Sequence, residues 1–203
     1  MTLLSDLAVG GWHPASFVDY PGRVAAVIFL QGCNFCCPYC HNPQLIPLGQ
    51  TGCLAPAKIL DHLARRRGKL DGVTLSGGEP TLQAALPLLC EELHNLGYPV
   101  KLDTNGSNPD MLAELLSAGL VDYLAMDLKA PLERYAELAG TKVDVNAIRC
   151  SMHLVSSSGV KHHFRTTYDQ SLLSPEDLQL IQKMVPEGSG YVVQPCRQPI
   201  VTR

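Results

Sequence analysis

The sequence predicts an α/β fold in which parallel strands alternate with helices. Three observations support this prediction: six short apolar runs with strand character, amphipathic segments between them, and polar motifs that follow the strands. Alternation of this kind requires right-handed crossovers and places helices outside the sheet. Six strand–helix units are too few to close an eight-unit barrel, so an open partial barrel or a doubly wound sheet is expected.

The first predicted strand covers residues 23–30 (RVAAVIFL), which are almost continuously apolar and follow the turn signal Tyr20-Pro-Gly22. Further apolar runs of the same character predict five more strands, at residues 73–75, 100–102, 123–128, 162–168 and 191–193. We expect one domain over residues 1–203, with a lead-in at 1–22, a core at 23–194 and a tail at 195–203.

The clearest predicted helix covers residues 81–96, where leucines recur at helical spacing and Gly97 follows the end. Weaker helical patterns centre on residues 59–63, 112–116, 148–155 and 178–185. The last of these begins with Ser174-Pro-Glu-Asp177, an N-cap followed by proline in the first turn. The basic run 65–69 is expected to end the first of them, where cations complement the helix dipole.

Composition limits the classes of function. A chain of 203 residues with 46% hydrophobic residues can bury a proper core, and a net charge of -3 makes nucleic acid an unexpected partner. No leader-like segment and no apolar stretch of about 18 residues stands out, so we expect a cytoplasmic protein with no membrane partner. Thiols are reduced in the cytoplasm, which favours metal binding or catalysis over disulfides.

Four of the eight cysteines lie in the segment Cys33-Asn-Phe-Cys-Cys-Pro-Tyr-Cys-His-Asn42, directly after the first predicted strand. Two CxxC pairs suggest zinc, but the spacer that lets two zinc knuckles face one metal is absent. Cys37-Pro-Tyr-Cys40 also resembles the glutaredoxin redox motif, although the chain is much longer than that fold needs. In a third interpretation, Cys33, Cys37 and Cys40 bind a [4Fe-4S] cluster and leave one iron without a protein ligand.

The other polar motifs follow the other predicted strands. Ser76-Gly-Gly-Glu-Pro80, Asp103-Thr-Asn-Gly106 and the segment 127–129 come after the second, third and fourth strands. Arg165 lies late in the fifth strand, and Gln194 follows the sixth. Ligands bind at the carboxyl ends of parallel strands, so one site can collect all of these residues.

C-x3-C-x2-C after one strand, with Gly77-Gly-Glu-Pro80 after the next, closely resembles the radical S-adenosylmethionine (SAM) superfamily. Five further segments resemble glycyl-radical-enzyme activases, most of all the activating proteins of anaerobic ribonucleoside-triphosphate reductase: Ser16-Phe-Val-Asp-Tyr-Pro-Gly22, Gln31-Gly-Cys-Asn34, Cys37-Pro-Tyr-Cys-His-Asn42, Asp103-Thr-Asn-Gly106 and Asp127-Leu-Lys129. The resemblance covers residues 11–194 and implies a partial (β/α)6 barrel.

The resemblance implies that Cys33, Cys37 and Cys40 hold the cluster and that Cys36 is surplus. In that superfamily, SAM chelates the open iron, and the reduced cluster cleaves SAM to methionine and a 5'-deoxyadenosyl radical. Gly77, Gly78 and Glu79 would receive the SAM amino group.

The resemblance also assigns roles to residues at the later strand ends. Asp103, Thr104 and Asp127 would hold a monovalent cation near the SAM carboxylate, although both aspartates could instead cap helices or pair with neighbouring groups. Lys129 would help to bind SAM, and Arg165 would pair with its carboxylate or with a neighbouring acid.

Four more positions complete the expected site. Tyr39 and Asn42 would lie near the adenine and the methionine part of SAM. Gln194 replaces a ribose-binding histidine of the related activase, and an amide can also bond to hydroxyls. Asp19 would contact the glycine loop of the substrate protein, although Asp-Tyr-Pro-Gly is also a good plain turn.

The remaining cysteines suggest no second cluster. Cys90 and Cys150 are expected to be buried in helices as small apolar residues, and Cys53 and Cys196 receive no role.

These features lead to the hypothesis of a radical SAM activase that forms a glycyl radical on a partner enzyme, with the anaerobic reductase as the expected partner. An external flavodoxin or ferredoxin would supply the electron. A small-molecule radical SAM synthase is the alternative enzyme, and a non-enzymatic zinc or thiol-redox protein is the alternative outside enzymes.

Overall fold

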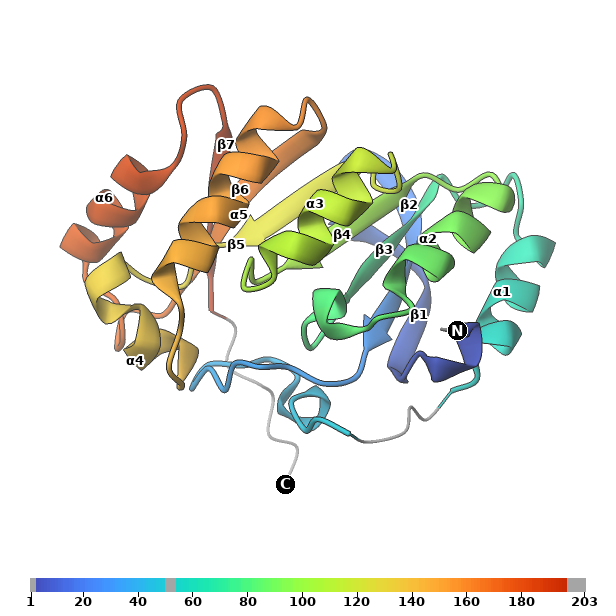
Figure 1. Cartoon of the computed structure of the whole chain (residues 1–203), viewed down its shortest axis with the longest axis horizontal. Helices are drawn as coiled ribbons and strands as arrows, with labels where there is room; N and C mark the ends of the chain where they lie inside the picture. The colour runs from blue at the N-terminus through green and yellow to red at the C-terminus, as the bar shows by residue number, and fades with distance from the viewer. Residues whose placement is uncertain (1–2, 50–53, 197–203) are drawn as a thin grey trace.

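The computed structural model describes residues 3–49 and 54–196, and within them one sheet of seven strands in the order β1-β2-β3-β4-β5-β6-β7 (Figure 1). The strands are β1 Val9–Tyr20, β2 Arg23–Leu30, β3 Gly72–Gly77, β4 Val100–Thr104, β5 Tyr123–Asp127, β6 Lys161–Tyr168 and β7 Gly190–Pro195. Strands β2 to β7 are parallel, and β1 pairs antiparallel with β2. β1 and β7 are the two edges, so the sheet is open, as expected from only six strand–helix units.

Helices gather on one face of this sheet (Figure 1). They are α1 Pro56–Arg65, α2 Leu86–Asn95, α3 Pro109–Ser117, α4 Tyr135–Ala139, α5 Val145–Ser157 and α6 Pro175–Met184, with short 3-10 turns at Leu4–Asp6, Pro43–Leu45, Pro80–Leu82 and Leu132–Arg134. No helix of the described residues combines the length and the apolar character needed to cross a membrane.

Side-chain alternation along the strands separates a core face from a polar face. Ile28, Leu75 and Leu102 point to the helices and are at most 1% exposed. Their strand neighbours Phe29 and Ser76 instead line a cavity on the other face. The six predicted strands are confirmed, each within two residues at both ends.

The expected lead-in over residues 1–22 contains a strand that was not predicted from the sequence, because β1 occupies Val9–Tyr20. Its register against β2 shifts three times, and most of its side chains are partly or fully exposed. Pro14 is tolerated because an edge strand needs donors on only one side. Backbone pairing, rather than an alternating apolar pattern, therefore defines this strand.

The prediction of one continuous helix over residues 81–96 is wrong, because α2 begins only at Leu86. Pro87 lies in the first turn of α2, the one place in a helix where a missing N–H costs nothing. The helix predicted to begin at Ser174 is confirmed: Ser174 Oγ accepts from Asp177 N at 3.2 Å and Asp177 Oδ2 accepts from Ser174 N at 2.9 Å.

Candidate functional site

The cysteine segment lies along the carboxyl ends of the strands and is held there by backbone hydrogen bonds. Gly32 N donates to Leu45 O at 2.8 Å, and Cys33 N donates to Ile46 O at 3.0 Å. Cys36 N donates to Ala139 O at 2.8 Å, at the end of the unpredicted helix α4. That helix fixes a loop which has little regular structure of its own.

Gly140 makes this contact with α4 close. It has φ +67°, and a Cβ there would lie 2.0 Å from the carbonyl oxygen of Cys36. The backbone of Cys36 is thus packed against α4, while its side chain is exposed.

A cavity of about 300 Å³ opens at this end of the sheet. Every site residue expected from the sequence lines it: Asp19, Cys33, Cys37, Tyr39, Cys40, Asn42, Gly77, Gly78, Glu79, Asp103, Thr104, Asp127, Lys129, Arg165 and Gln194. The structure therefore brings together residues from all seven strands or the loops that follow them, whereas Cys36 lies outside the lining.

Burial raises the pKa of two of the cysteines that line the cavity. It raises the pKa of Cys33 to about 11 and raises that of Cys37 as well. Both thiols hold their protons near neutral pH, and a bound iron would replace those protons. The donor set thus suits a soft, thiolate-binding metal centre.

Tyr39 provides a second indication that the cavity is suited to a polar ligand. Its hydroxyl is buried in the cavity wall and has no hydrogen-bond partner among the described residues. Burial also raises its pKa, so the hydroxyl stays neutral and can donate. A buried hydroxyl without a partner is costly, and a polar ligand in the cavity would satisfy it.

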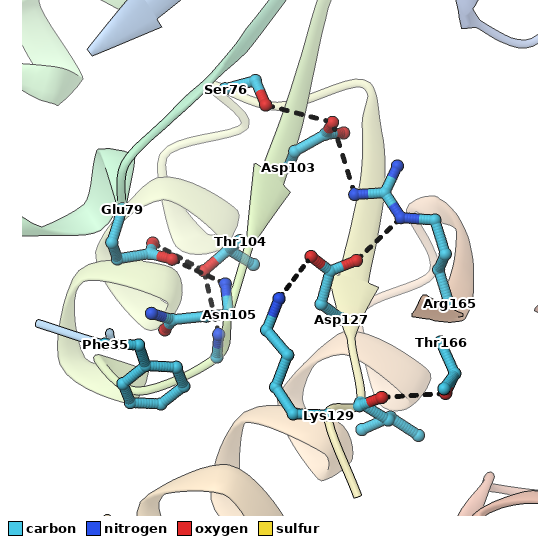
Figure 2. Close-up of polar contacts among 12 residues, drawn as sticks. Phe35, Ser76, Glu79, Asp103, Thr104, Asn105, Asp127, Lys129, Arg165 and Thr166 are labelled. Atoms are coloured by element: carbon cyan, nitrogen blue, oxygen red, sulfur yellow. Dashed lines mark hydrogen bonds and ion pairs between the residues drawn. The ribbon is translucent and has the colours of Figure 1, made fainter. Parts of the chain in front are cut away.

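Glu79 joins the loops that follow β3 and β4 (Figure 2). Its carboxylate accepts from Thr81 N at 3.1 Å, Thr104 Oγ1 at 2.8 Å and Asn105 N at 2.6 Å. The side chain is 1% exposed; burial raises its pKa, and the hydrogen bonds oppose that shift. Glu79 therefore supports the cavity wall by holding these two loops together.

Gly78 makes the close contact between the β2 and β3 loops possible. A Cβ at this position would lie 2.1 Å from Gly32 O, and Glu79 N donates to the same oxygen at 2.8 Å. A second backbone hydrogen bond joins the same two segments: Gly78 N donates to Leu30 O at 2.9 Å. Glycine at position 78 is thus required for the close contact between these two loops as well as for access to the cavity.

Alternating charges cross the polar face from β4 to β6 (Figure 2). Arg165 Nε donates to Asp127 Oδ1 at 2.7 Å, and Arg165 Nη2 lies 3.6 Å from Asp103 Oδ2. Lys129 Nζ donates to the other oxygen of Asp127 at 2.9 Å. Burial alone would raise the pKa of Asp127, but these two cations overcome it and hold the pKa well below its ordinary range.

The three residues expected to hold a monovalent cation line the same cavity, but each is engaged by another side chain. Thr104 Oγ1 is directed to Glu79, and both aspartates are paired with side-chain cations. Within residues 3–49 and 54–196, no group of three or more His, Cys, Asp or Glu side chains is arranged around a single metal ion. A four-iron cluster does not need side chains arranged around one ion, because each cysteine thiolate binds a different iron of the cluster.

Asp19 reaches the cavity because β1 is irregular. The register between β1 and β2 shifts between Ser16 and Tyr20, and Asp19 O accepts from Thr74 Oγ1 at 3.3 Å. The Asp19 carboxylate also pairs with the hydroxyl of Ser16. The turn expected here from Asp-Tyr-Pro-Gly begins at the end of β1. Asp19 therefore both precedes this turn and lines the cavity.

Sequence reasoning missed Lys101, which contacts Asp103 and is 2% exposed. A lysine two residues before an aspartate in an apolar strand lies on the same face, and this signal could have revealed it. Asn105, to which the sequence analysis gave no role, donates from Nδ2 to Asn34 Oδ1 at 3.0 Å and so ties its loop to the cysteine segment.

The other cysteines behave in different ways. Cys90 is fully buried in α2, as expected, and burial raises its pKa to about 12. The expectation that Cys150 is buried is wrong, because it lies on the exposed side of α5. Cys196 is half-buried, and Cys53 lies outside the described residues. All seven described cysteines are free thiols.

An open parallel sheet with three cysteines in a cavity at its carboxyl edge suits an iron–sulfur domain, and comparison with known proteins identifies the family. Residues 27–183 match the model of the radical SAM superfamily, and the chain belongs to that superfamily. Within it, the chain groups with the glycyl-radical-enzyme activating enzymes.

Two relatives support that grouping. A Methanocaldococcus jannaschii protein, assigned by name to the glycyl-radical enzyme activating enzymes, is 35% identical over 92% of this chain and 78% of its own length. The pyruvate formate-lyase-activating enzyme of Clostridium pasteurianum is 34% identical over 55% of this chain and 48% of its own. The chain thus spans most of the first relative and about half of the second.

A solved structure supports the fold. SuiB of Streptococcus suis, bound to S-adenosylmethionine, superposes with a TM-score of 0.67 at 16% identity. The match covers 84% of this chain and 40% of SuiB. At this identity the likeness concerns the fold alone.

Proposed function

We propose that this protein is a radical SAM activase that generates a glycyl radical on a partner enzyme, with the anaerobic ribonucleoside-triphosphate reductase as the first candidate. One observation carries the proposal: a single cavity collects the cysteine triad, the charged residues of β4 to β6 and Asp19. The similarity to activating enzymes supports the same reaction class.

In this proposal Cys33, Cys37 and Cys40 hold a [4Fe-4S] cluster, and SAM occupies the remainder of the cavity. When bound, the two groups supply one-electron reduction and a radical strong enough to remove hydrogen from a glycine Cα. An external flavodoxin or ferredoxin would deliver the electron, and the reduced thiols suit the cytoplasm.

The protein's own side chains bind and orient these groups. Lys129 brings positive charge to the cavity wall, where it would attract the carboxylate of SAM. The neutral hydroxyl of Tyr39 and the amides of Asn42 and Gln194 would bond to its polar atoms. Arg165 contributes mainly by fixing the two aspartates.

The proposal is tested by adding SAM and anaerobic ribonucleoside-triphosphate reductase to the reduced protein. A glycyl doublet in the EPR spectrum of the reductase is expected, together with release of 5'-deoxyadenosine. SAM cleavage without that doublet, with pyruvate formate-lyase tried in parallel, would favour a small-molecule synthase instead.

The surface beside Asp19 supports a macromolecular substrate. Phe17 and Val18 directly precede it in β1 and are 80% and 87% exposed. Two large apolar side chains that project into solvent next to the cavity are suited to contact another protein.

Replacing both Phe17 and Val18 with serine is expected to lower glycyl-radical formation about tenfold at limiting reductase, because apolar contact with the partner is lost. SAM cleavage in the absence of reductase should not change. Leu180→Ser removes an exposed apolar side chain from α6 and is the matched control. An equal loss in the control would show that general solubility, rather than docking, is responsible.

A further inference from the structure

Lys101 is a buried cation that the proposed reaction does not yet use. It lies in β4 between Thr74 of β3 and Tyr123 of β5, with which it forms ladder pairs. It is 2% exposed, and its ammonium group forms an ion pair with Asp103 Oδ1. A lysine is rarely buried to this degree without a role for its charge.

Neither Asp103 nor Asp127 has a free carboxylate oxygen. Lys101 takes Oδ1 of Asp103, while Oδ2 accepts from Ser76 Oγ at 3.3 Å and faces Arg165. Arg165 and Lys129 take the two oxygens of Asp127. A metal cation at this place would have to displace a side-chain cation from its carboxylate.

The charge balance leads to the same conclusion. Lys101, Arg165 and Lys129 carry three positive charges against the two negative charges of Asp103 and Asp127. A further cation would raise a net charge of +1 to +2 in a largely buried cluster, which is unfavourable. Without Lys101 the cluster would be neutral, and one carboxylate oxygen would be free to bind a cation.

We propose that Lys101 is a built-in counter-ion which replaces a monovalent metal ion in this site, so that SAM binds without sodium or potassium. Lys101 acts through Asp103 and is a positioning residue. This inference rests on the proposed SAM site, and it replaces the expectation of a cation held by Asp103, Thr104 and Asp127.

The test compares sodium, potassium and choline chlorides at equal ionic strength, with the SAM dissociation constant of the anaerobically reconstituted protein as the readout. The wild type should vary less than about twofold among the three salts. Lys101→Met, which keeps an unbranched side chain of similar size but not its charge, should bind SAM about tenfold more weakly in choline and recover in potassium. Lys101→Arg should behave as the wild type.

A second readout needs neither SAM nor the cluster. In the full chain, potassium should raise the unfolding temperature of Lys101→Met by about 3 °C relative to choline and leave the wild type unchanged. Should the wild type bind no SAM at all, the proposed function fails, while this measurement still decides the role of Lys101. If Lys101→Met does not fold, Lys101→Gln is measured instead.

Leu102→Ala is the control for general destabilisation, because Leu102 is fully buried on the opposite face of β4. It should lower the unfolding temperature in all three salts without any dependence on the cation. The inference is overturned if the wild type needs sodium or potassium for SAM affinity, if the uncharged variant Lys101→Met (or Lys101→Gln) remains insensitive to the cation, or if Leu102→Ala acquires the same sensitivity.

Discussion

Replacing Cys37 with serine is expected to reduce iron in the reconstituted protein from about four atoms per chain to nearly none. Cys37 lines the cavity and is half-buried, and a serine hydroxyl there is a far poorer iron ligand than a thiolate. Iron and sulfide analysis, with the broad visible absorbance of the cluster, measures the effect.

The neighbouring thiol provides a matched control in the same loop. Cys36 is exposed and outside the cavity lining, and its backbone bond to Ala139 does not depend on its side chain. Cys36→Ser should therefore retain the full iron content. Loss of iron in Cys36→Ser and its retention in Cys37→Ser would refute the assignment of Cys33, Cys37 and Cys40 as the ligand set.

The positions of the parallel strands along the sequence could be predicted because the strands are buried. Each of β2 to β6 packs apolar side chains against the helices, and such runs are visible in any sequence. β1 has no such signal, since only two of its twelve residues are buried and its place depends on backbone bonds to β2. α2 was predicted to start too early because leucine spacing outweighed Pro87.

The candidate site could be predicted as a set for a geometric reason. Residues that end parallel strands must meet at one edge of the sheet, so Asp103, Asp127 and Arg165 converge even though they are far apart in the chain. Their mutual pairing could not be predicted, because it depends on side-chain reach. Lys101 escaped notice because a buried lysine is uncommon, and Thr104 faces Glu79 because adjacent strand residues alternate.

Asp127→Asn is expected to lower the free energy of unfolding at pH 7 by about 3 kcal/mol, because removing one partner of a buried ion pair leaves uncompensated charge. Asp127 lies between Arg165 and Lys129, so its loss leaves two cations without their shared anion. Chemical denaturation of the chain without its cluster measures the change. Glu137→Gln, which breaks an exposed pair with Arg134, should have no measurable effect.

The pH dependence separates lost charge from lost packing. Arg165 and Lys129 hold the pKa of Asp127 below its unfolded value near 4. A carboxyl group with a lowered pKa stabilises the folded state above the unfolded pKa, and this contribution disappears as pH falls through the folded pKa. The difference in the free energy of unfolding between wild type and Asp127→Asn should thus be constant from about pH 7 to 5 and shrink below about pH 4. A difference that persists at low pH would mean that the asparagine disrupts packing, and that the ion pairs contribute little to holding β5 and β6 at the site.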